Sequence, residues 1–153
     1  MNVFRAGPEQ LPELARLFDL YRQFYDCPPN LSLAETFLAQ RLGQDESVIF
    51  AARLDNNSDN SIAGFVQLYP SFCSVDAIKI LILYDLYVDA QCRRLGVGEM
   101  LMKRASSYAL EVGAGRLDLL TAHSNSRGQR LYEKLGYEKT NQDFYAYSLY
   151  VTP

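Results

Sequence analysis

"AIKILILYDLYV" (residues 77–88) is the most apolar stretch of the chain, and "DAQCRRLGVG" (89–98) follows it directly. A run of this kind is typical of a central strand that is buried on both faces. Asp85 is the one acidic residue inside it. From Gly98 to Val112 the apolar residues recur at helical spacing, and Gly113 is a helix stop. The sequence therefore predicts a strand–loop–helix unit at the centre of the fold.

The loop of this unit has the features of an anion-binding site. Gly96 and Gly98 let the backbone adopt conformations closed to other residues and let a ligand approach the main chain. The free N–H groups of a first helical turn attract phosphate, and Arg93 and Arg94 add positive charge. The P-loop pattern is absent, and the dinucleotide pattern GxGxxG fails at Leu101. We expect a pyrophosphate here, and these residues leave open which ligand carries it.

Outward from this unit, periodicity and turn residues predict the other elements. Strands are expected at 2–6, 47–54, 62–71 (ended by Pro70), 77–88, 116–122 and 144–151, and helices at 8–25, 31–43, 98–112 and 125–136. The order is β-α-α-β-β-β-α-β-α-β, which is a mixed α/β class. At 153 residues the chain suits a single domain, 1–153.

Composition excludes several classes of protein. The net charge is -3 and the pI about 5.1, so a basic footprint for nucleic acid is missing. Neither a signal peptide nor an apolar run of roughly 18 residues is present, so we expect a cytosolic chain that does not enter a membrane. The three cysteines, Cys27, Cys73 and Cys92, are widely spaced, which favours neither disulfides nor a metal site.

Two segments together carry a resemblance to a known family. "LYDLYVDAQCRRLGVGEMLM" (83–102), followed by "NSRGQRLYEKLGY" (125–137), resembles the GNAT superfamily of N-acetyltransferases, whose signature is Q/R-x-x-G-x-G/A. Arg93, Gly96 and Gly98 match that signature. The element order is also that of the GNAT fold, in which the central strands splay apart. The "YRQFYD" and "NQDFYAYSLYV" segments are similar, more loosely, to fungal histone/polyamine and D-amino-acid acetyltransferases.

The resemblance implies an acetyl-CoA-dependent transferase and a set of cofactor contacts. The pantetheine arm would bond the backbone of Leu86, Tyr87 and Val88, and Asn125 would contact that arm. The pyrophosphate would lie against the loop residues Arg93, Arg94, Leu95, Gly96, Val97, Gly98 and Glu99. Tyr132 aligns with the tyrosine that commonly protonates the departing thiolate and is also expected at the cofactor.

Acetyl transfer to an amine also needs a group that accepts a proton. Some polyamine-acetylating relatives carry an acidic residue just before the position of Asp85, but Tyr84 stands there in this chain. Asp85 is therefore the candidate base, acting through water, and the alternative is a structural role in bonding nearby backbone.

Substrate choice is expected to come from the first two helices and the segment after Tyr69. Aromatic rings with a carboxylate suit a cationic amine. The candidates are Tyr21, Tyr25, Asp26, Tyr69 and Ser71. We expect a small primary amine, such as a polyamine or an amino acid; a protein or peptide acetyltransferase and a non-catalytic acyl-CoA-binding module are the alternatives. The tyrosine-rich last strand makes a homodimer possible.

Overall fold

The computed structural model describes residues 1–55, 60–140, 143 and 145–151. The chain divides into two compact units, Met1–Leu120 and Thr121–Pro153. Each is described by itself below.

The first unit is built on one mixed sheet of five strands in the order β1-β2-β3-β4-β5. The strands are β1 (Asn2–Arg5), β2 (Val48–Arg53), β3 (Ile62–Cys73), β4 (Ile78–Val88) and β5 (Arg116–Asp118). All neighbours are antiparallel except β4 and β5, which are parallel. A parallel pair needs a crossover, and the helix that follows the 89–98 loop supplies it.

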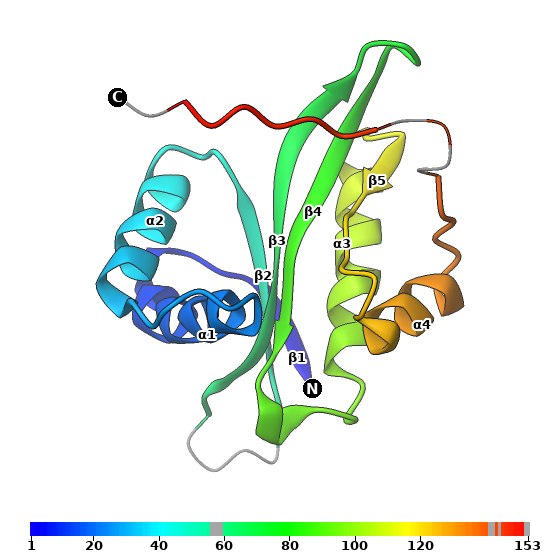
Figure 1. Cartoon of the computed structure of the whole chain (residues 1–153). Helices are drawn as coiled ribbons and strands as arrows, with labels where there is room; N and C mark the ends of the chain where they lie inside the picture. Colours follow the sequence, from blue (N-terminus) through cyan, green and yellow to red (C-terminus); the bar gives the residue numbers. More distant parts are fainter. Residues whose placement is uncertain (56–59, 141–142, 144, 152–153) are drawn as a thin grey trace. The chain divides into compact units, whose positions relative to one another are not determined.

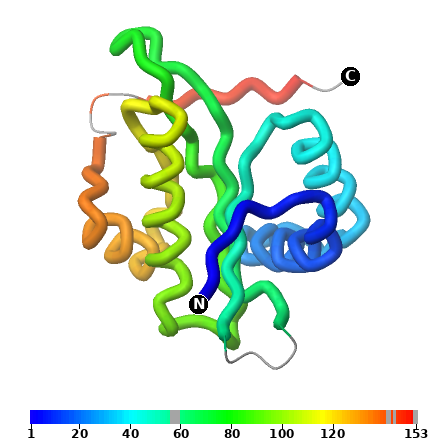
Figure 2. The backbone as a smooth tube through the Cα atoms, turned by 180° about the vertical axis from the view of Figure 1, so that it is seen from behind, coloured from blue at the N-terminus to red at the C-terminus, as the bar shows by residue number. Residues whose placement is uncertain are grey.

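Helices cover both faces of this sheet. Helices α1 (Leu11–Phe24) and α2 (Leu31–Gly43) lie on one face, and α3 (Val97–Glu111) lies on the other (Figures 1 and 2). Two short 3-10 helices, η1 (Pro8–Gln10) and η2 (Ala90–Cys92), precede α1 and α3. The predicted helices at 31–43 and 98–112 are confirmed to within one residue at each end.

Side-chain alternation along the strands divides the core between the two faces. On β2, Ile49 joins the cluster beneath α1 and α2, whereas Phe50 packs against Tyr108 of α3 with ring centroids 5.3 Å apart. On β3, Phe65 meets Phe18 of α1 edge-on at 6.4 Å. The sheet is thus buried on both faces, as the apolar runs predict.

Strand β3 runs through Pro70, although the sequence predicts that it ends there. Pro70 lies opposite Leu81 of β4, while the last residue of β3 that pairs with β2 is Leu68, opposite Val48. Beyond Leu68 the strand is therefore an edge strand on that side, where a missing N–H needs no partner. The prediction was wrong because sequence does not show where a neighbouring strand stops.

The second unit contains α4 (Ser126–Lys134). The strand predicted at 144–151 is not formed: residues 145–151 are in no strand, and Phe144 lies outside the described residues. Tyr147 and Tyr150 are both 91% exposed. Alternation alone is not sufficient, because a strand needs a neighbour for its backbone groups. For the same reason β5 ends at Asp118 rather than 122: its pairing with β4 covers only Ile80–Ile82.

Candidate active site

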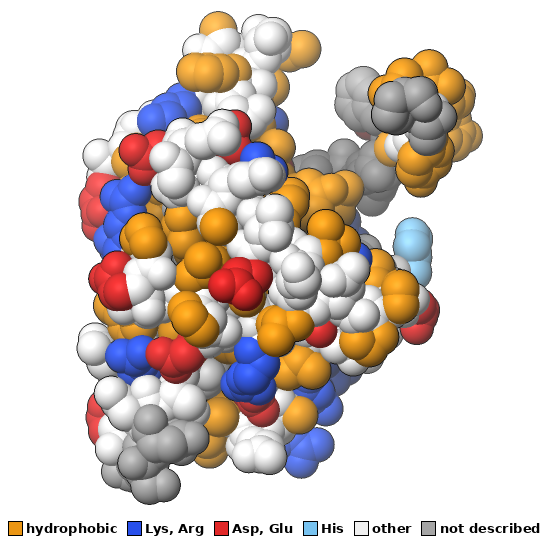
Figure 3. Space-filling model, turned by 90° about the vertical axis from the view of Figure 1, so that its left-hand side faces the viewer, with side chains coloured by type: hydrophobic (Ala, Val, Ile, Leu, Met, Phe, Trp, Pro, Cys, Tyr) orange, Lys and Arg blue, Asp and Glu red, His pale blue; other side chains and the backbone are white. Residues whose placement is uncertain are grey.

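A cavity of about 590 Å³ opens on the α1 and α2 face of the first unit. It is lined by Phe18, Tyr21, Arg22, Leu33, Phe37, Tyr69, Ile82, Tyr84 and Asp85. On this face of the molecule acidic and basic side chains are interspersed with hydrophobic ones (Figure 3). The cavity itself is largely aromatic and aliphatic, which is typical of a small-molecule site with a few polar groups that fix orientation.

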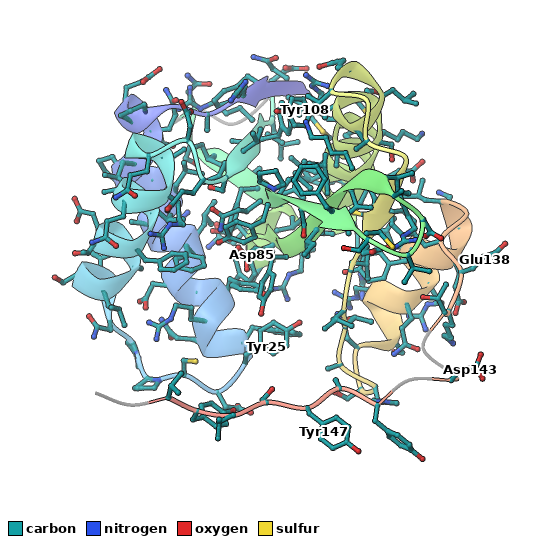
Figure 4. All side chains as sticks on the ribbon, turned by 90° about the horizontal axis from the view of Figure 1, so that it is seen from above. Tyr25, Asp85, Tyr108, Glu138, Asp143 and Tyr147 are labelled. Carbon is teal, nitrogen blue, oxygen red and sulfur yellow. The ribbon has the colours of Figure 1, made fainter. Side chains whose placement is uncertain are left out.

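Asp85 is the buried acid of this cavity. Its side chain lies between α1 and the sheet (Figure 4), and the residue is only 3% exposed. Gln67 Nε2 donates a hydrogen bond to Asp85 Oδ2, and Ser47 Oγ donates to Gln67 Oε1 at 2.8 Å. Burial raises the pKa of Asp85, and the hydrogen bonds from Gln67 and Tyr21 oppose that shift without cancelling it. The carboxylate is therefore a stronger proton acceptor than an exposed aspartate.

Tyr21 closes the cavity beside this carboxylate. Its hydroxyl donates to the backbone carbonyl of Tyr84 at 3.2 Å. Burial, followed by the negative charge of Asp85, raises the pKa of Tyr21, and the same two causes raise that of Tyr69. Both hydroxyls therefore stay protonated at neutral pH and can donate hydrogen bonds.

A β-bulge brings two successive residues of β4 to the same cavity. Gln67 lies opposite Asp85, but the next residue of β3, Leu68, lies opposite Leu83, so Tyr84 is the extra residue. In a regular strand residues 84 and 85 point to opposite faces. The bulge re-aims the Tyr84 side chain, whose ring lies 5.7 Å from that of Tyr69.

The 89–98 loop forms a second feature of this unit. Arg94 and Gly96 both have positive φ angles, 65° and 81°. The first α-helical bond of α3 runs from Met100 N to Gly96 O, so the N–H groups of the first helical turn before Met100 point toward the loop rather than into the helix ladder. A Cβ atom added to Gly96 would meet nothing within 4 Å. Open main chain at the positive end of a helix fits a pyrophosphate.

Contacts with the sheet hold this loop in place. Arg93 Nε donates to the carbonyl of Val88 at 3.1 Å, and its guanidinium lies 5.7 Å from the centre of the Tyr87 ring. Asp89 pairs with Arg16 of α1 at 3.1 Å. The Arg93 side chain thus turns back to the end of β4 and shapes the loop.

Gly64 is a structural requirement of this region that the sequence did not reveal. A Cβ on Gly64 would lie 2.7 Å from the carbonyl oxygen of Tyr87 and 3.1 Å from Val97 Cγ1. Glycine therefore permits β3, β4 and the start of α3 to approach one another. A lone glycine inside an apolar run signals such an approach but does not say what approaches.

In the second unit, Asn125 caps α4. Its Oδ1 accepts from Gly128 N at 3.1 Å, and its Nδ2 donates to Thr121 Oγ1 at 3.0 Å. Tyr132 lies further along α4, and the centroid of its ring is 6.1 Å from that of Tyr137. The capping role of Asn125 is thus visible, whereas cofactor contacts of Asn125 and Tyr132 stay predictions.

The structure brings together some of the residues predicted to bind the acceptor. Tyr21 and Tyr69 line the cavity, and Tyr25 packs edge-on against Tyr21 with centroids 5.3 Å apart. Asp26 and Ser71 are not among the lining residues, and their role stays a prediction.

Several lining residues were missed by the sequence analysis: Phe18, Arg22, Leu33, Phe37, Ile82 and Tyr84. Helical spacing offered a signal for some of them, because Phe18 and Arg22 are four residues apart, as are Leu33 and Phe37. That spacing does not distinguish a core stripe from the wall of a cavity.

Two further observations concern the described part of the chain. It contains no group of three or more His, Cys, Asp or Glu side chains placed to hold a metal ion. None of the helices within 1–55 and 60–140 is long and apolar enough to cross a bilayer.

Comparison with known proteins identifies the family. The profile of the "Acetyltransferase (GNAT) family" matches residues 14–137. The uncharacterized N-acetyltransferase YhfO of Bacillus subtilis (strain 168) is 41% identical over 91% of this chain and 91% of its own length. A solved structure, described as a probable acetyltransferase, is 36% identical, with a TM-score of 0.89 over 100% of this chain and 99% of that one.

A more distant relative is the D-amino-acid N-acetyltransferase HPA3 of Saccharomyces cerevisiae, 28% identical over 85% of this chain and 80% of its own length. The family profile covers the loop, the buried aspartate and α4 in one match. The protein therefore belongs to the GNAT family of N-acetyltransferases, whose acetyl donor is acetyl-CoA.

Proposed function

We propose that this acetyltransferase acetylates the primary amine of a small molecule, which binds in the Asp85 cavity and attacks while both substrates are bound. The observation that carries the proposal is the cavity of about 590 Å³ with one buried carboxylate in an aromatic wall. Such a space matches a small ligand, because small-molecule sites are roughly 300–1,000 Å³ and mostly apolar.

The donor is proposed to bind at the 89–98 loop. The main-chain N–H groups of residues 93–99, with the open backbone at Gly96, would hold the pyrophosphate, and the backbone of 86–88 would bond the pantetheine arm. When bound, acetyl-CoA supplies the acetyl group as an activated thioester. Asn125 of α4 is assigned to the same arm by its match to the family motif.

Proton transfer divides between two residues in this proposal. The acceptor arrives as an ammonium ion and gives one proton to the Asp85 carboxylate, directly or through water, which makes its nitrogen nucleophilic. The nitrogen then forms the bond to the acetyl carbon while the carbon–sulfur bond breaks. The second nitrogen proton is lost to solvent, and Tyr132 gives a proton to the leaving sulfur.

Tyr132→Phe is expected to reduce turnover about tenfold or more, because the sulfur loses its proton donor while water replaces it only in part. Affinity for acetyl-CoA should change little, since the ring remains. Steady-state kinetics with calorimetric titration of acetyl-CoA checks both statements.

Tyr137→Phe is the matched control, because it removes a hydroxyl from the neighbouring ring. It should leave turnover unchanged. Equal turnover of Tyr132→Phe and the wild type would remove Tyr132 from the reaction and assign the proton to water.

Two relatives support a small acceptor without deciding which one. The Arabidopsis thaliana relative is named L-ornithine N5-acetyltransferase NATA1 and is 28% identical over 54% of this chain and 36% of its own length; the yeast HPA3 protein is named for D-amino acids. Both names denote amino-acid acceptors. The similarity to the fungal histone/polyamine and D-amino-acid acetyltransferases is part of the same proposal.

The first experiment is a calorimetric titration with acetyl-CoA, followed in the same preparation by a thiol-release screen over polyamines, amino acids and basic peptides. Release that depends on a small amine supports the proposal. Release only with peptides would make the protein a peptide acetyltransferase. Binding without release from any acceptor would favour an acyl-CoA sensor.

A further inference from the structure

Arg22 is the second charged residue of the cavity, and the proposed reaction does not use it. It follows Tyr21 on α1 and lines the cavity. Its Nη1 atom is buried and has no hydrogen-bond partner among the described residues. An arginine carries five N–H donors, and leaving one buried and unbonded is costly.

Asp19 is the ion-pair partner of Arg22, and both of its oxygens already accept hydrogen bonds from other groups. Arg22 Nη1 lies 3.8 Å from Asp19 Oδ1, which is beyond hydrogen-bond distance. Asp19 Oδ1 accepts from Asn30 N at 2.8 Å, and Asp19 Oδ2 accepts from Gln23 Nε2 at 3.0 Å. Asp19 therefore balances part of the Arg22 charge as an ion-pair partner but accepts no hydrogen bond from Nη1, and the guanidinium retains a donor for an anion.

Apart from the tyrosine hydroxyls, the remainder of the wall is aromatic and aliphatic. The other lining residues include the aromatic rings of Phe18 and Phe37 and the aliphatic side chain of Ile82. The stacked rings of Phe18 and Phe37 are 5.5 Å apart. The cavity thus offers one positive group, one negative group and a hydrophobic surface.

We propose that the acceptor is an amino acid with a large aliphatic or aromatic side chain. Its amine lies toward Asp85, its carboxylate binds the Arg22 guanidinium, and its side chain packs on the aromatic wall. This inference deepens the proposed function. The acetyl transfer to the amino acid rests on that proposed function, whereas the binding of the amino acid does not.

Other amines satisfy the cavity less well. A polyamine would place a second ammonium group against the Arg22 charge, which costs free energy in a cavity of low dielectric constant. A simple alkylamine would leave the Arg22 donor unbonded on burial. An amino acid with a charged side chain would have to desolvate that charge against the rings.

The test compares amines that differ only by the carboxylate. The pairs are leucine with 3-methylbutylamine and phenylalanine with 2-phenylethylamine, with spermidine as the polyamine. The wild type should acetylate each amino acid with a lower KM than its matching amine. Arg22→Met should raise the KM of the amino acids about tenfold or more, through loss of a charge-assisted hydrogen bond, and leave the KM of the amines nearly unchanged.

Two variants serve as controls. Arg104→Met removes an arginine on α3, on the other face of the sheet, where it pairs with Glu111 at 2.9 Å, and should alter neither KM. Arg22→Lys keeps the positive charge without the planar fork and should restore part of the preference for the carboxylate. If Arg22→Met does not fold, the Arg22→Lys comparison decides alone.

Calorimetric binding of leucine and phenylalanine in the presence of CoA separates this inference from the proposed function. Suppose that the amino acids bind, that Arg22→Met or Arg22→Lys weakens this binding, and that no amine is acetylated. That result would support the inference and refute the transferase proposal. Preferred acetylation of spermidine or of the alkylamines would overturn the inference while the transferase proposal stands. The inference would also be overturned if the amino acids neither bind nor react. The same holds if both Arg22 variants still prefer the amino acids to the matching amines.

Discussion

Asp85→Asn is expected to reduce turnover about a thousandfold, within the range that general acid–base catalysis supplies. Asparagine keeps the size of the side chain and still accepts the hydrogen bond from Gln67 Nε2, but it cannot take a proton from the acceptor amine. Steady-state kinetics with the best acceptor of the thiol-release screen measures the effect. Affinity for acetyl-CoA should not change.

The pH dependence of turnover checks the same assignment. The wild type should lose activity on the acid side as Asp85 becomes protonated, with an apparent pKa above that of an ordinary aspartate because burial raises the pKa of Asp85. The residual activity of Asp85→Asn should lack this acid limb. An unaltered limb in the variant would assign the base to another group.

Stability distinguishes catalysis from a structural role of Asp85. The folded chain holds the Asp85 proton more tightly than the unfolded chain, in which an aspartate has a pKa of about 3.9. The stabilisation is therefore complete below that pH and is lost as pH rises through the raised folded pKa. Asp85→Asn should be at least as stable as the wild type at pH 7 in thermal unfolding. A large loss of stability would instead indicate that the carboxylate is structural.

Asp76→Asn is the matched control for these measurements. Asp76 lies on the exposed turn between β3 and β4, where it accepts a hydrogen bond from Arg116 Nη1 at 2.6 Å. Removal of this carboxylate should leave turnover and its pH profile unchanged.

Gly96→Val is expected to weaken acetyl-CoA binding about a hundredfold, as loss of two charge-assisted hydrogen bonds would. The space where its side chain would lie is open, so the valine meets no protein atom within 4 Å where its Cβ begins. It would instead obstruct the approach of a pyrophosphate to the main chain. Calorimetric titration with acetyl-CoA and with CoA measures the effect.

Backbone strain must be separated from obstruction in this experiment. Gly96 has φ of 81°, which costs about 1–2 kcal/mol for a residue with a side chain. Gly113, just beyond the end of α3, has φ of 70° and equally open space. Gly113→Val should therefore lower the unfolding temperature by a similar amount and leave the affinity for acetyl-CoA unchanged. Equal affinities in the two variants would remove the loop from the cofactor site.

The local sequence pattern predicted secondary structure correctly where the pattern of a single segment is sufficient. The apolar run at 77–88 predicted β4, and the spacing from Gly98 onward predicted α3, because burial on both faces and an amphipathic stripe are properties of single segments. The same reasoning failed at Pro70 and at 145–151. Whether a strand forms there depends on a neighbour that the local pattern does not describe.

The family, the α/β class and the loop at Gly96 could be predicted from the sequence, because each rests on motifs and periodicities that lie within continuous segments of the chain. The cavity proposed for the acceptor could not be predicted in this way, because its walls come from segments that are distant in the chain. The bulge at Tyr84, the Ser47–Gln67–Asp85 chain of hydrogen bonds and the unbonded Arg22 donor join α1, β2, β3 and β4. Burial raises the pKa of Asp85 and makes an unbonded arginine donor costly in free energy. The carboxylate and this donor become buried only when these segments pack together.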